Sequence, residues 1–257
     1  MTIPFHKYQG AGNDFIILDG MQKANEPDSA IIKKLCDRRF GVGADGLMII
    51  LPSDKADFHM KYWNADGKEG SLCGNGGRCI VRFAHDRNYT GKTCLFTASD
   101  GEHRGEIDGE TVYLQMQTVK MPDDPEKLII DTGSPHIVVP VEGIDGYDVV
   151  GEGRRLRFSD LYKPGGTNVN FLQEISTHEI RQRTYERGVE DETLACGTGA
   201  VAGALYQAWR HNIDEGEIIV HMPGGKLKVS FARNEKKFVN LKLSGPAKFV
   251  FSGQAEL

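Results

Sequence analysis

The feature that most constrains this chain is an internal repeat at a spacing of 123 residues. Without any gap, Tyr62 aligns with Tyr185, and the segment CGNG at residues 73–76 aligns with CGTG at residues 196–199. Isolated glycine matches mean little in a chain with 31 glycines. A matched Cys-Gly-x-Gly segment that follows a matched tyrosine at the same spacing is a strong sign of duplication. The repeat therefore predicts two equivalent halves.

The boundary between the halves is expected near residue 120, because the segment MPDDP at residues 121–125 interrupts the pattern. We expect an N-terminal half of residues 1–118, to which residues 246–257 return, and a C-terminal half of residues 119–245. A chain of 257 residues can bury a core of its own, so neither disulfides nor metals are needed for folding.

Alternating apolar residues predict strands at residues 111–117, 226–231 and 239–243. Strands joined by short turns favour antiparallel pairing over a doubly wound parallel sheet. The turn dipeptides between the expected strands are Asp66-Gly67, Asp100-Gly101 and Asp108-Gly109.

Few helices are expected. One is capped by Ser29 and ends near Gly41, and two others cover residues 77–88 and 200–211. A few helices among many short strands indicate the α+β class.

Composition excludes several classes of protein. Hydrophobic residues make up 39% and charged residues 26%, which is typical of a globular chain and not of a disordered or collagen-like one. A net charge of −5, without any basic run, argues against nucleic acid or an anionic membrane as a partner. The longest apolar runs, residues 47–51 and 137–141, are too short to cross a bilayer, and the first residues do not form a signal peptide. We therefore expect a cytoplasmic protein.

Five scattered cysteines in such a chain argue against structural disulfides and for reactive thiols. Cys73 and Cys196 stand directly before expected helices, where unpaired backbone N–H groups and the helix dipole lower a thiol pKa. The glycines that follow each cysteine let these N–H groups reach a carboxylate. A single cysteine of this kind could simply fill a small apolar space, but two in matched positions favour a function.

Two such thiols can invert a stereocentre if they face each other across a cleft. One thiolate removes a proton from carbon while the other thiol supplies a proton to the opposite face. The two helix starts would stabilise the carbanion, and no dinucleotide fingerprint or P-loop lysine is present, so we expect no cofactor. We also expect no metal, because the closely spaced Cys73 and Cys79 lack a second Cys or His pair at zinc-like distance. A non-catalytic ligand-binding protein and a redox sensor with two facing thiols are alternatives.

Several motifs resemble the diaminopimelate epimerase family, in family order and over nearly the full length. They are NADG at 64–67, CGNGGR at 73–78, YERG at 185–188, TLACGTGA at 193–200, GAGNDF at 10–15, GVGADG at 41–46 and NVNF at 168–171. The resemblance implies interconversion of LL- and meso-diaminopimelate without pyridoxal phosphate, on the route to lysine and peptidoglycan. It also implies a homodimer, and two similar halves that each wrap a mixed, barrel-like sheet around a central helix, with the site between them.

The resemblance also implies roles for particular residues. Cys73 and Cys196 would be the acid/base thiols, and His136 and Glu186 would tune their pKa values. The substrate would be bound by Asn13, Asn64, Asn168, Glu186 and Arg187, and its reacting carboxylate by Gly74, Asn75, Gly197 and Thr198.

Diaminopimelate has a second amino-acid head group, which calls for an anion and a cation away from the thiols. The adjacent Glu186 and Arg187 supply both, although such a pair can also be a plain surface feature. The nearest alternative enzyme is a proline or hydroxyproline racemase, which uses the same pair of thiols. Its substrate has no second charged head group and would leave Glu186 and Arg187 unused. Two positions depart from the family, which often has Gln in place of Gly46 and Asn in place of Ser134. We expect a water or a neighbouring side chain to fill in at both.

Overall fold

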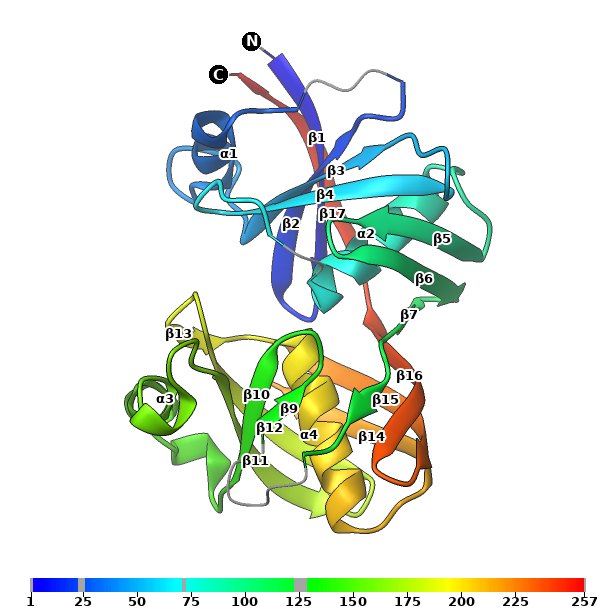
Figure 1. The fold of residues 1–257 in the computed structure, drawn as a ribbon. Helices are drawn as coiled ribbons and strands as arrows, with labels where there is room; N and C mark the ends of the chain where they lie inside the picture. The colour runs from blue at the N-terminus through cyan, green and yellow to red at the C-terminus, as the bar shows by residue number, and fades with distance from the viewer. Residues whose placement is uncertain (1, 23–25, 71–72, 123–128, 257) are drawn as a thin grey trace. The chain divides into compact units, whose positions relative to one another are not determined.

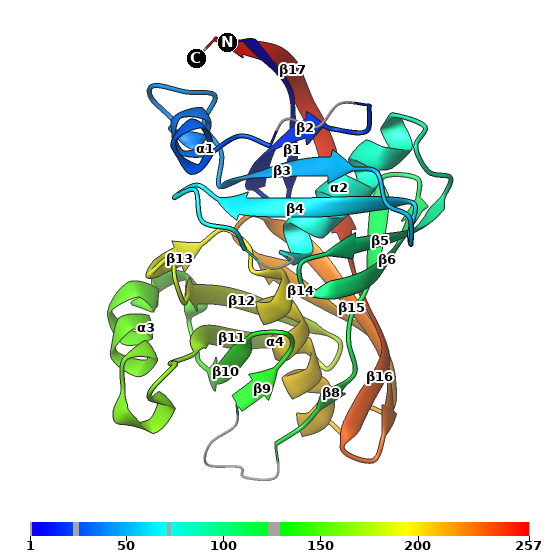
Figure 2. The same ribbon diagram turned by 45° about the horizontal axis from the view of Figure 1, so that its top comes forward.

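The computed structural model describes residues 2–22, 26–70, 73–122 and 129–256. The chain forms two compact units (Figures 1 and 2). The first unit is Met1–Leu114 together with Gly245–Leu257, and the second is Gln115–Ser244.

The first unit wraps a sheet around one long helix, α2 (Gly74–Asp86). Its strands pair in the order β17-β1-β2-β3-β4-β5-β6-β7. Their bounds are β1 Thr2–Gly10, β2 Asn13–Asp19, β3 Gly46–Leu51, β4 Phe58–Asn64, β5 Thr93–Ala98, β6 Gly101–Asp108, β7 Thr111–Gln115 and β17 Lys248–Glu256.

The second unit repeats this plan around α4 (Gly197–Arg210). Its strands pair in the order β9-β10-β11-β12-β14-β15-β16-β8, and β13 adds to β12. The strand bounds are β8 Val119–Lys120, β9 Ile129–Asp131, β10 Pro135–Pro140, β11 Asn168–Ser176, β12 Glu179–Glu186, β13 Asp191–Thr193, β14 Glu215–Met222, β15 Gly225–Asn234 and β16 Lys237–Pro246. The other helical segments are α3 Val149–Arg157, η1 Ile144–Gly146 and η2 Asp160–Tyr162.

Strand direction shows the duplication clearly. From β1 to β7 the successive pairs are antiparallel, parallel, antiparallel, parallel, antiparallel and antiparallel, and the pairs from β9 to β16 follow the same order. The start of α4 lies 123 residues after the start of α2. The α+β class is confirmed, but the expectation of antiparallel pairing was incomplete. Each unit contains two parallel pairs, because a helical crossover joins the strands of each one.

Two of the predicted strands lie within β15 and β16, and the third coincides with β7, which ends two residues earlier than expected. The predicted helices were placed less well. Asp28, and not Ser29, caps α1 (Ser29–Cys36) by accepting a hydrogen bond from the Ile31 N–H, and this helix ends five residues before Gly41. Both central helices start three residues earlier than predicted, because glycine is tolerated in a first turn whose N–H groups need no intrahelical partner.

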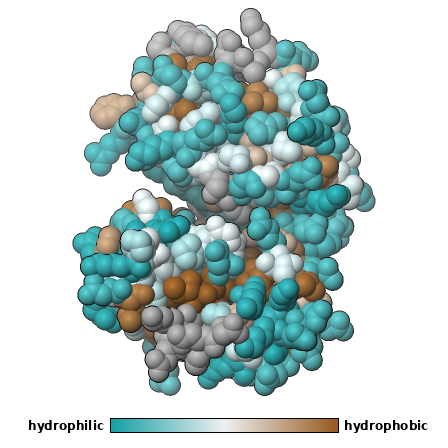
Figure 3. All heavy atoms as spheres, viewed as in Figure 1, coloured by the Kyte–Doolittle hydropathy of each residue, from teal (hydrophilic) through white to brown (hydrophobic). Residues whose placement is uncertain are grey.

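The sheet of the first unit is covered by helices on both faces. Ile32 and Leu35 of α1 pack against Ile16 and Leu18 of β2, while Phe15 of the same strand contacts the first turn of α2. Figure 3 shows a mostly hydrophilic face with small groups of apolar side chains. In the described ranges, no helix is long and apolar enough to span a membrane.

Candidate active site

Each of the two cysteines predicted to act as acid or base occupies the N-cap of a central helix. Cys73 precedes α2 and Cys196 precedes α4, both with extended backbone angles. The Cys73 carbonyl accepts from the Gly77 N–H at 2.7 Å, and the Cys196 carbonyl accepts from the Ala200 N–H at 2.9 Å. The first N–H groups of both helices, which have no intrahelical acceptor, therefore lie next to the cysteines and are of the kind that binds anions. Cys73 is half-buried and Cys196 is buried.

In the first unit, two amide side chains surround Cys73. Its Sγ lies 3.6 Å from Asn13 Oδ1, which also accepts from Asn75 Nδ2 at 3.2 Å. Asn13 Nδ2 donates to Asp45 at 2.5 Å, so a carboxylate fixes which end of the Asn13 amide faces the thiol. The thiol proton of Cys73 therefore has an acceptor in Asn13.

Asp45 belongs to a cluster of four charges behind Asn13. Lys7 pairs with Asp14 at 2.7 Å, and Arg38 bridges Asp14 at 2.7 Å and Asp45 at 2.6 Å. Burial acts to raise the pKa of Asp14, but hydrogen bonds from Arg38 and Lys7 outweigh it and hold this pKa below its usual value. Two cations and two anions balance one another here.

In the second unit, a hydroxyl and an imidazole stand beside Cys196. Its Sγ lies 3.5 Å from Thr198 Oγ1, and Thr198 Oγ1 lies 3.0 Å from His136 Nε2. The predicted pKa-tuning histidine thus bonds to Thr198, which in turn bonds to the cysteine. Its effect on the thiol would pass through the Thr198 hydroxyl.

The tautomer of His136 follows from Asn170. Asn170 Oδ1 accepts from Gln182 Nε2 at 3.1 Å and from Thr184 Oγ1 at 2.9 Å, which fixes the amide so that its NH₂ group faces His136. Because Asn170 Nδ2 donates to His136 Nδ1 at 3.1 Å, Nδ1 is unprotonated and Nε2 carries the proton. Nε2–H then donates to Thr198, whose own proton is free to point at Cys196.

His136 is neutral at physiological pH. Complete burial lowers its pKa to about 3, and the positive charge of Arg187 acts in the same direction, while the Asn170 hydrogen bond opposes them. The imidazole therefore serves as a fixed hydrogen-bond donor and carries no charge of its own.

Asn168, Arg187 and Ser134 form one hydrogen-bonded group. Asn168 Oδ1 accepts from the Arg187 backbone N–H at 2.8 Å, and Asn168 Nδ2 donates to Ser134 Oγ at 2.9 Å. Arg187 Nη2 donates to the same hydroxyl at 3.5 Å. Ser134, a departure from the family, thus holds both predicted substrate-binding residues.

Within the described ranges no carboxylate is ion-paired with Arg187, and the neighbouring Glu186 is half-buried at the end of β12.

The other departure, Gly46, is explained by Tyr62. A Cβ atom at residue 46 would lie 2.5 Å from the Tyr62 ring and 2.7 Å from the Trp63 carbonyl oxygen. No side chain fits at this position. The Tyr62 hydroxyl donates instead to Asn64 Oδ1 at 2.8 Å, so a neighbouring side chain holds this exposed, predicted substrate-binding residue.

The 123-residue repeat relates the two groups of site residues to each other. The equivalent pairs are Asn13 with His136, Asp45 with Asn168, Asn64 with Arg187, Cys73 with Cys196, Gly74 with Gly197, and Asn75 with Thr198. In both units the residue at the start of the second strand bonds to the residue two positions after the cysteine. Two copies of one backbone frame therefore carry different polar groups around the two thiols.

Three residues that contact the predicted site residues had no role in the sequence analysis. Asp45 orients Asn13, Asn170 orients His136, and Arg78 donates to Asn75. All three lie inside the motifs that carry the family resemblance. Asn170 could have been found from its place two residues after Asn168 on one strand, and Asp45 from its equivalence to Asn168.

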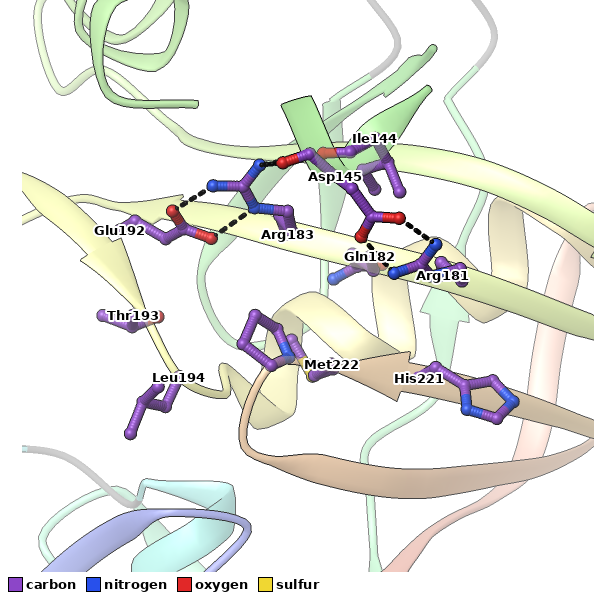
Figure 4. A pocket seen from close by; sticks show the side chains of 11 residues that line it. Ile144, Asp145, Arg181, Gln182, Arg183, Glu192, Thr193, Leu194, His221 and Met222 are labelled. Atoms are coloured by element: carbon purple, nitrogen blue, oxygen red, sulfur yellow. Dashed lines mark hydrogen bonds and ion pairs between the residues drawn. The ribbon is translucent and has the colours of Figure 1, made fainter. Parts of the chain in front are cut away.

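A pocket of about 720 Å³ lies elsewhere in the second unit, and no predicted site residue lines it. Figure 4 shows that its two arginines already have partners: Arg181 pairs with Asp145, and Arg183 pairs with Glu192 at 2.6 Å. Leu194, Met222 and Pro223 add apolar surface. Paired charges leave no evident group for recognising a ligand.

Solved structures with the same fold define the broad class. A PhzF-family phenazine biosynthesis protein of Bacillus anthracis superposes with a TM-score of 0.76 at 19% identity, with 100% of both chains covered. A hydroxyproline epimerase of Agrobacterium vitis superposes with a TM-score of 0.68 at 14% identity, covering 100% of this chain and 93% of that one. The fold is therefore the two-unit fold of these proteins.

Sequence comparison identifies the family within this class. The diaminopimelate epimerase family model matches residues 5–122 and 128–250. The diaminopimelate epimerase of Flavobacterium psychrophilum is 44% identical over 249 residues, which cover 96% of this chain and 97% of that protein. The Chlorobaculum tepidum protein of the same name is 40% identical, covering 96% and 99%. The chain belongs to the diaminopimelate epimerase family.

Proposed function

We propose that this protein interconverts LL- and meso-diaminopimelate, with Cys73 and Cys196 as the acid/base pair. The observation that carries the proposal is the duplicated placement of a thiol at the N-cap of each central helix, in a chain of this family. Each thiol has its own set of polar neighbours, as two groups with opposite protonation states require.

In the proposed reaction, one cysteine as thiolate removes the α-proton of the substrate. The other cysteine, as thiol, delivers its proton to the opposite face of the same carbon. The C–H bond that breaks and the one that forms lie on opposite faces, so the configuration inverts. The enzyme ends with the thiol and thiolate exchanged and no net change in protons.

The α-proton of an amino acid is a weak acid, so the negative charge that develops must be stabilised. We propose that the N–H groups of Gly74, Asn75, Gly197 and Thr198 bind the reacting carboxylate and spread this charge over two helix starts. No cofactor or metal takes part in this scheme.

The second head group of the substrate would be bound away from the thiols. Arg187, without a carboxylate partner in the described chain and held by Asn168 and Ser134, suits its carboxylate. Glu186 suits its ammonium group, and Asn13 and Asn64 supply further amide contacts. Glu186 would also tune the thiols, together with His136.

We further propose that residues 1–118 with 246–257 and residues 119–245 act as the two functional halves, in a cytoplasmic homodimer. The exposed apolar residues of β17 support a second copy as partner: Phe249 and Val250 are each 51% exposed, and Phe251 is 45% exposed. The net charge of −5 supports the expectation that neither nucleic acid nor an anionic membrane is a partner.

The test is proton NMR of the reduced, metal-chelated protein in deuterated water, with LL-diaminopimelate and separately with L-proline. We expect the α-proton signal of diaminopimelate to disappear while the meso isomer accumulates. Exchange with proline alone would keep the thiol pair and overturn the role of Glu186 and Arg187. No exchange with either compound would favour a binding protein.

Variants of the two cysteines test the mechanism. Cys73→Ala and Cys196→Ala should each abolish epimerisation and leave the fold intact, whereas Cys94→Ala should remain active. Near-normal turnover by either of the first two variants would overturn the two-thiol mechanism. Activity that persists after mild oxidation would argue against thiols that face each other.

A further inference from the structure

Arg78 is a buried cation for which the described part of the chain offers no acidic partner. Its side chain is completely buried and turns back toward the start of its own helix, where Nη1 donates to the Gly74 carbonyl at 3.2 Å and Nη2 to Asn75 Oδ1 at 2.9 Å. Its Nε has no hydrogen-bond partner, and no carboxylate in the described ranges pairs with it. A buried charge of this kind normally has an anion beside it.

The other charges around this helix start are already balanced. Lys7 of β1 and Asp14 of β2 pair with each other, and Arg38 bridges Asp14 and Asp45, the partner of Asn13. On α2 itself, burial raises the pKa of the Cys79 thiol to about 12, so Cys79 is neutral. The charge of Arg78 is thus the one without a counter-charge among these groups.

Burial lowers the pKa of Arg78. The guanidinium pKa starts so high, however, that the side chain keeps its charge near neutral pH. Two thiols interact with this charge: a negative Cys79 or Cys73 would stabilise the Arg78 cation. Of these, Cys73 is the half-buried one at the N-cap.

The second unit lacks this charge. Residue 201, equivalent to Arg78 in the 123-residue repeat, is Val201, which is completely buried in α4. Among the described neighbours of Cys196 are the Thr198 hydroxyl and, behind it, the neutral His136, on whose pKa the charge of Arg187 acts. The two thiols therefore occupy equivalent backbone positions, but the residue five positions after each cysteine differs: it is the cation Arg78 in the first unit and the apolar Val201 in the second.

We infer that Arg78 is a positioning residue that breaks the symmetry between the two thiols: its charge holds Cys73 as the thiolate in the free enzyme, while Cys196 rests as the thiol. The inference rests on the proposed function, since only an acid/base pair needs this asymmetry. The hydrogen bond to Asn75 gives Arg78 a second effect, because it turns the Asn75 amide toward Asn13 and fixes the first turn of α2. Two dipoles oppose this assignment: the Asn13 oxygen favours the thiol form of Cys73, and the Thr198 hydroxyl favours the thiolate of Cys196. The inference therefore requires the full charge of Arg78 to outweigh both dipoles.

The test is the rate of alkylation of each cysteine as a function of pH. The intact, substrate-free protein is treated with iodoacetamide, and the peptides that carry Cys73 and Cys196 are quantified separately by mass spectrometry. Alkylation reports the thiolate of each cysteine and requires no turnover. The variants are Arg78→Met, Arg78→Lys and, as the matched control in the other helix, Val201→Met.

In the wild type, the alkylation of Cys73 should rise at a pH at least one unit below that of Cys196. Arg78→Met should move the Cys73 profile upward by about one unit, a tenfold loss of thiolate at a given pH, and leave the Cys196 profile unchanged. Arg78→Lys, which keeps the charge, should retain most of the difference, and Val201→Met should change neither profile.

A folded Arg78→Met variant with an unchanged Cys73 profile would overturn the inference. If that variant fails to fold, the wild-type protein alone still tests the inference. Alkylation of Cys196 at a lower pH than alkylation of Cys73 would contradict the assignment of Cys73 as the thiolate. Turnover of diaminopimelate is measured on the same samples. Inactive wild-type protein would refute the proposed function, whereas active protein with the reverse order of profiles would refute only the role of Arg78.

Discussion

His136 Nε2 and Thr198 Oγ1 lie 3.0 Å apart, and the direction of this hydrogen bond decides what the Thr198 hydroxyl offers to Cys196. Because Asn170 donates to Nδ1, the imidazole proton sits on Nε2 and points at Thr198. The hydroxyl proton is then free for the sulfur atom 3.5 Å away, and such a donor stabilises the thiolate. The thiolate of Cys196 that forms during turnover thus has a donor in place.

Thr198→Val should slow the reaction and leave the backbone N–H of residue 198 available to the substrate. Losing a hydrogen bond to a charged sulfur costs about 1.5–3 kcal/mol, so we expect kcat to fall roughly 10- to 100-fold with a smaller change in KM. The measurement is the initial rate of solvent deuterium incorporation into diaminopimelate. Thr198→Ser, which keeps the hydroxyl, is the control, and a Val variant as fast as the Ser variant would contradict the prediction.

Asn170→Ala should impair the enzyme through the tautomer of His136. Without the Nδ2 donor, the imidazole proton can occupy Nδ1, and Nε2 then competes with Cys196 for the Thr198 proton. In ¹⁵N NMR spectra of the wild type, we expect His136 to have an unprotonated Nδ1 and a protonated Nε2. In the variant we expect a mixture of the two tautomers. Thr184→Val is the control, because Gln182 still orients the Asn170 amide. A variant with the wild-type tautomer would refute this explanation.

Stability should fall with acid because His136 is buried in its neutral form. Its pKa drops from 6.5 to about 3 on folding, so between these values the unfolded chain binds more protons. The stabilisation is fully present above pH 6.5 and is lost as the pH falls toward 3. Going from pH 7.5 to pH 5 should cost roughly 2 kcal/mol through this one residue.

The measurement is urea unfolding of the wild type and of His136→Gln at both pH values. The variant should lose about 2 kcal/mol less than the wild type over this interval, whatever its stability at pH 7.5. His178→Gln, a change at an exposed histidine, should behave as the wild type does. Equal losses in all three proteins would mean that His136 is not buried in its neutral form.

Gly46→Ala should destabilise the first unit. The new methyl group would overlap the Tyr62 ring and the Trp63 carbonyl oxygen, and the carbonyl belongs to a paired strand that cannot move away. Overpacking of this kind costs about 1–3 kcal/mol, which urea unfolding can detect. Gly91→Ala is the control, because nothing lies within 4 Å of a Cβ atom there. A Gly46 variant as stable as the control would show that Tyr62 can give way.

Much of this arrangement could be predicted from the repeat. The matched turns before the two central helices placed both thiols at helix starts, because a Cys-Gly-x-Gly segment leaves its N–H groups unpaired wherever it enters a helix. The parallel pairings could not be predicted in the same way. They join strands separated by a helix, and local apolar alternation carries no information about which distant strand lies alongside.

The polar neighbours of the thiols show the same limit. That Asn13 and His136 lie near their cysteines follows from the family resemblance, but the roles of Asp45 and Asn170 depend on which atom of an amide or imidazole faces which partner. Those orientations come from side chains on several strands and loops. The direction of the Arg78 side chain is likewise a matter of packing around its helix.

Arg187→Lys should weaken substrate binding more than it slows the chemistry. The guanidinium can make two parallel hydrogen bonds to the distal carboxylate, whereas an ammonium cannot reproduce this geometry. Within the described chain Arg187 is not held by a carboxylate, and its side-chain hydrogen bonds to Gly165 and Ser134 are long, at 3.5 Å each. Most of the loss should therefore fall on the bonds to the substrate. We expect KM for diaminopimelate to rise about tenfold, equivalent to about 1.4 kcal/mol, with kcat within about threefold of the wild type.

The matched control is Arg155→Lys, because Arg155 is an exposed arginine already paired with Glu152 on the surface of α3. Surface pairs of this kind contribute little, so its kinetics should equal those of the wild type. A fall in kcat at unchanged KM for Arg187→Lys would move this arginine from the distal head group to the reacting carbon, and an unchanged enzyme would remove it from the site altogether.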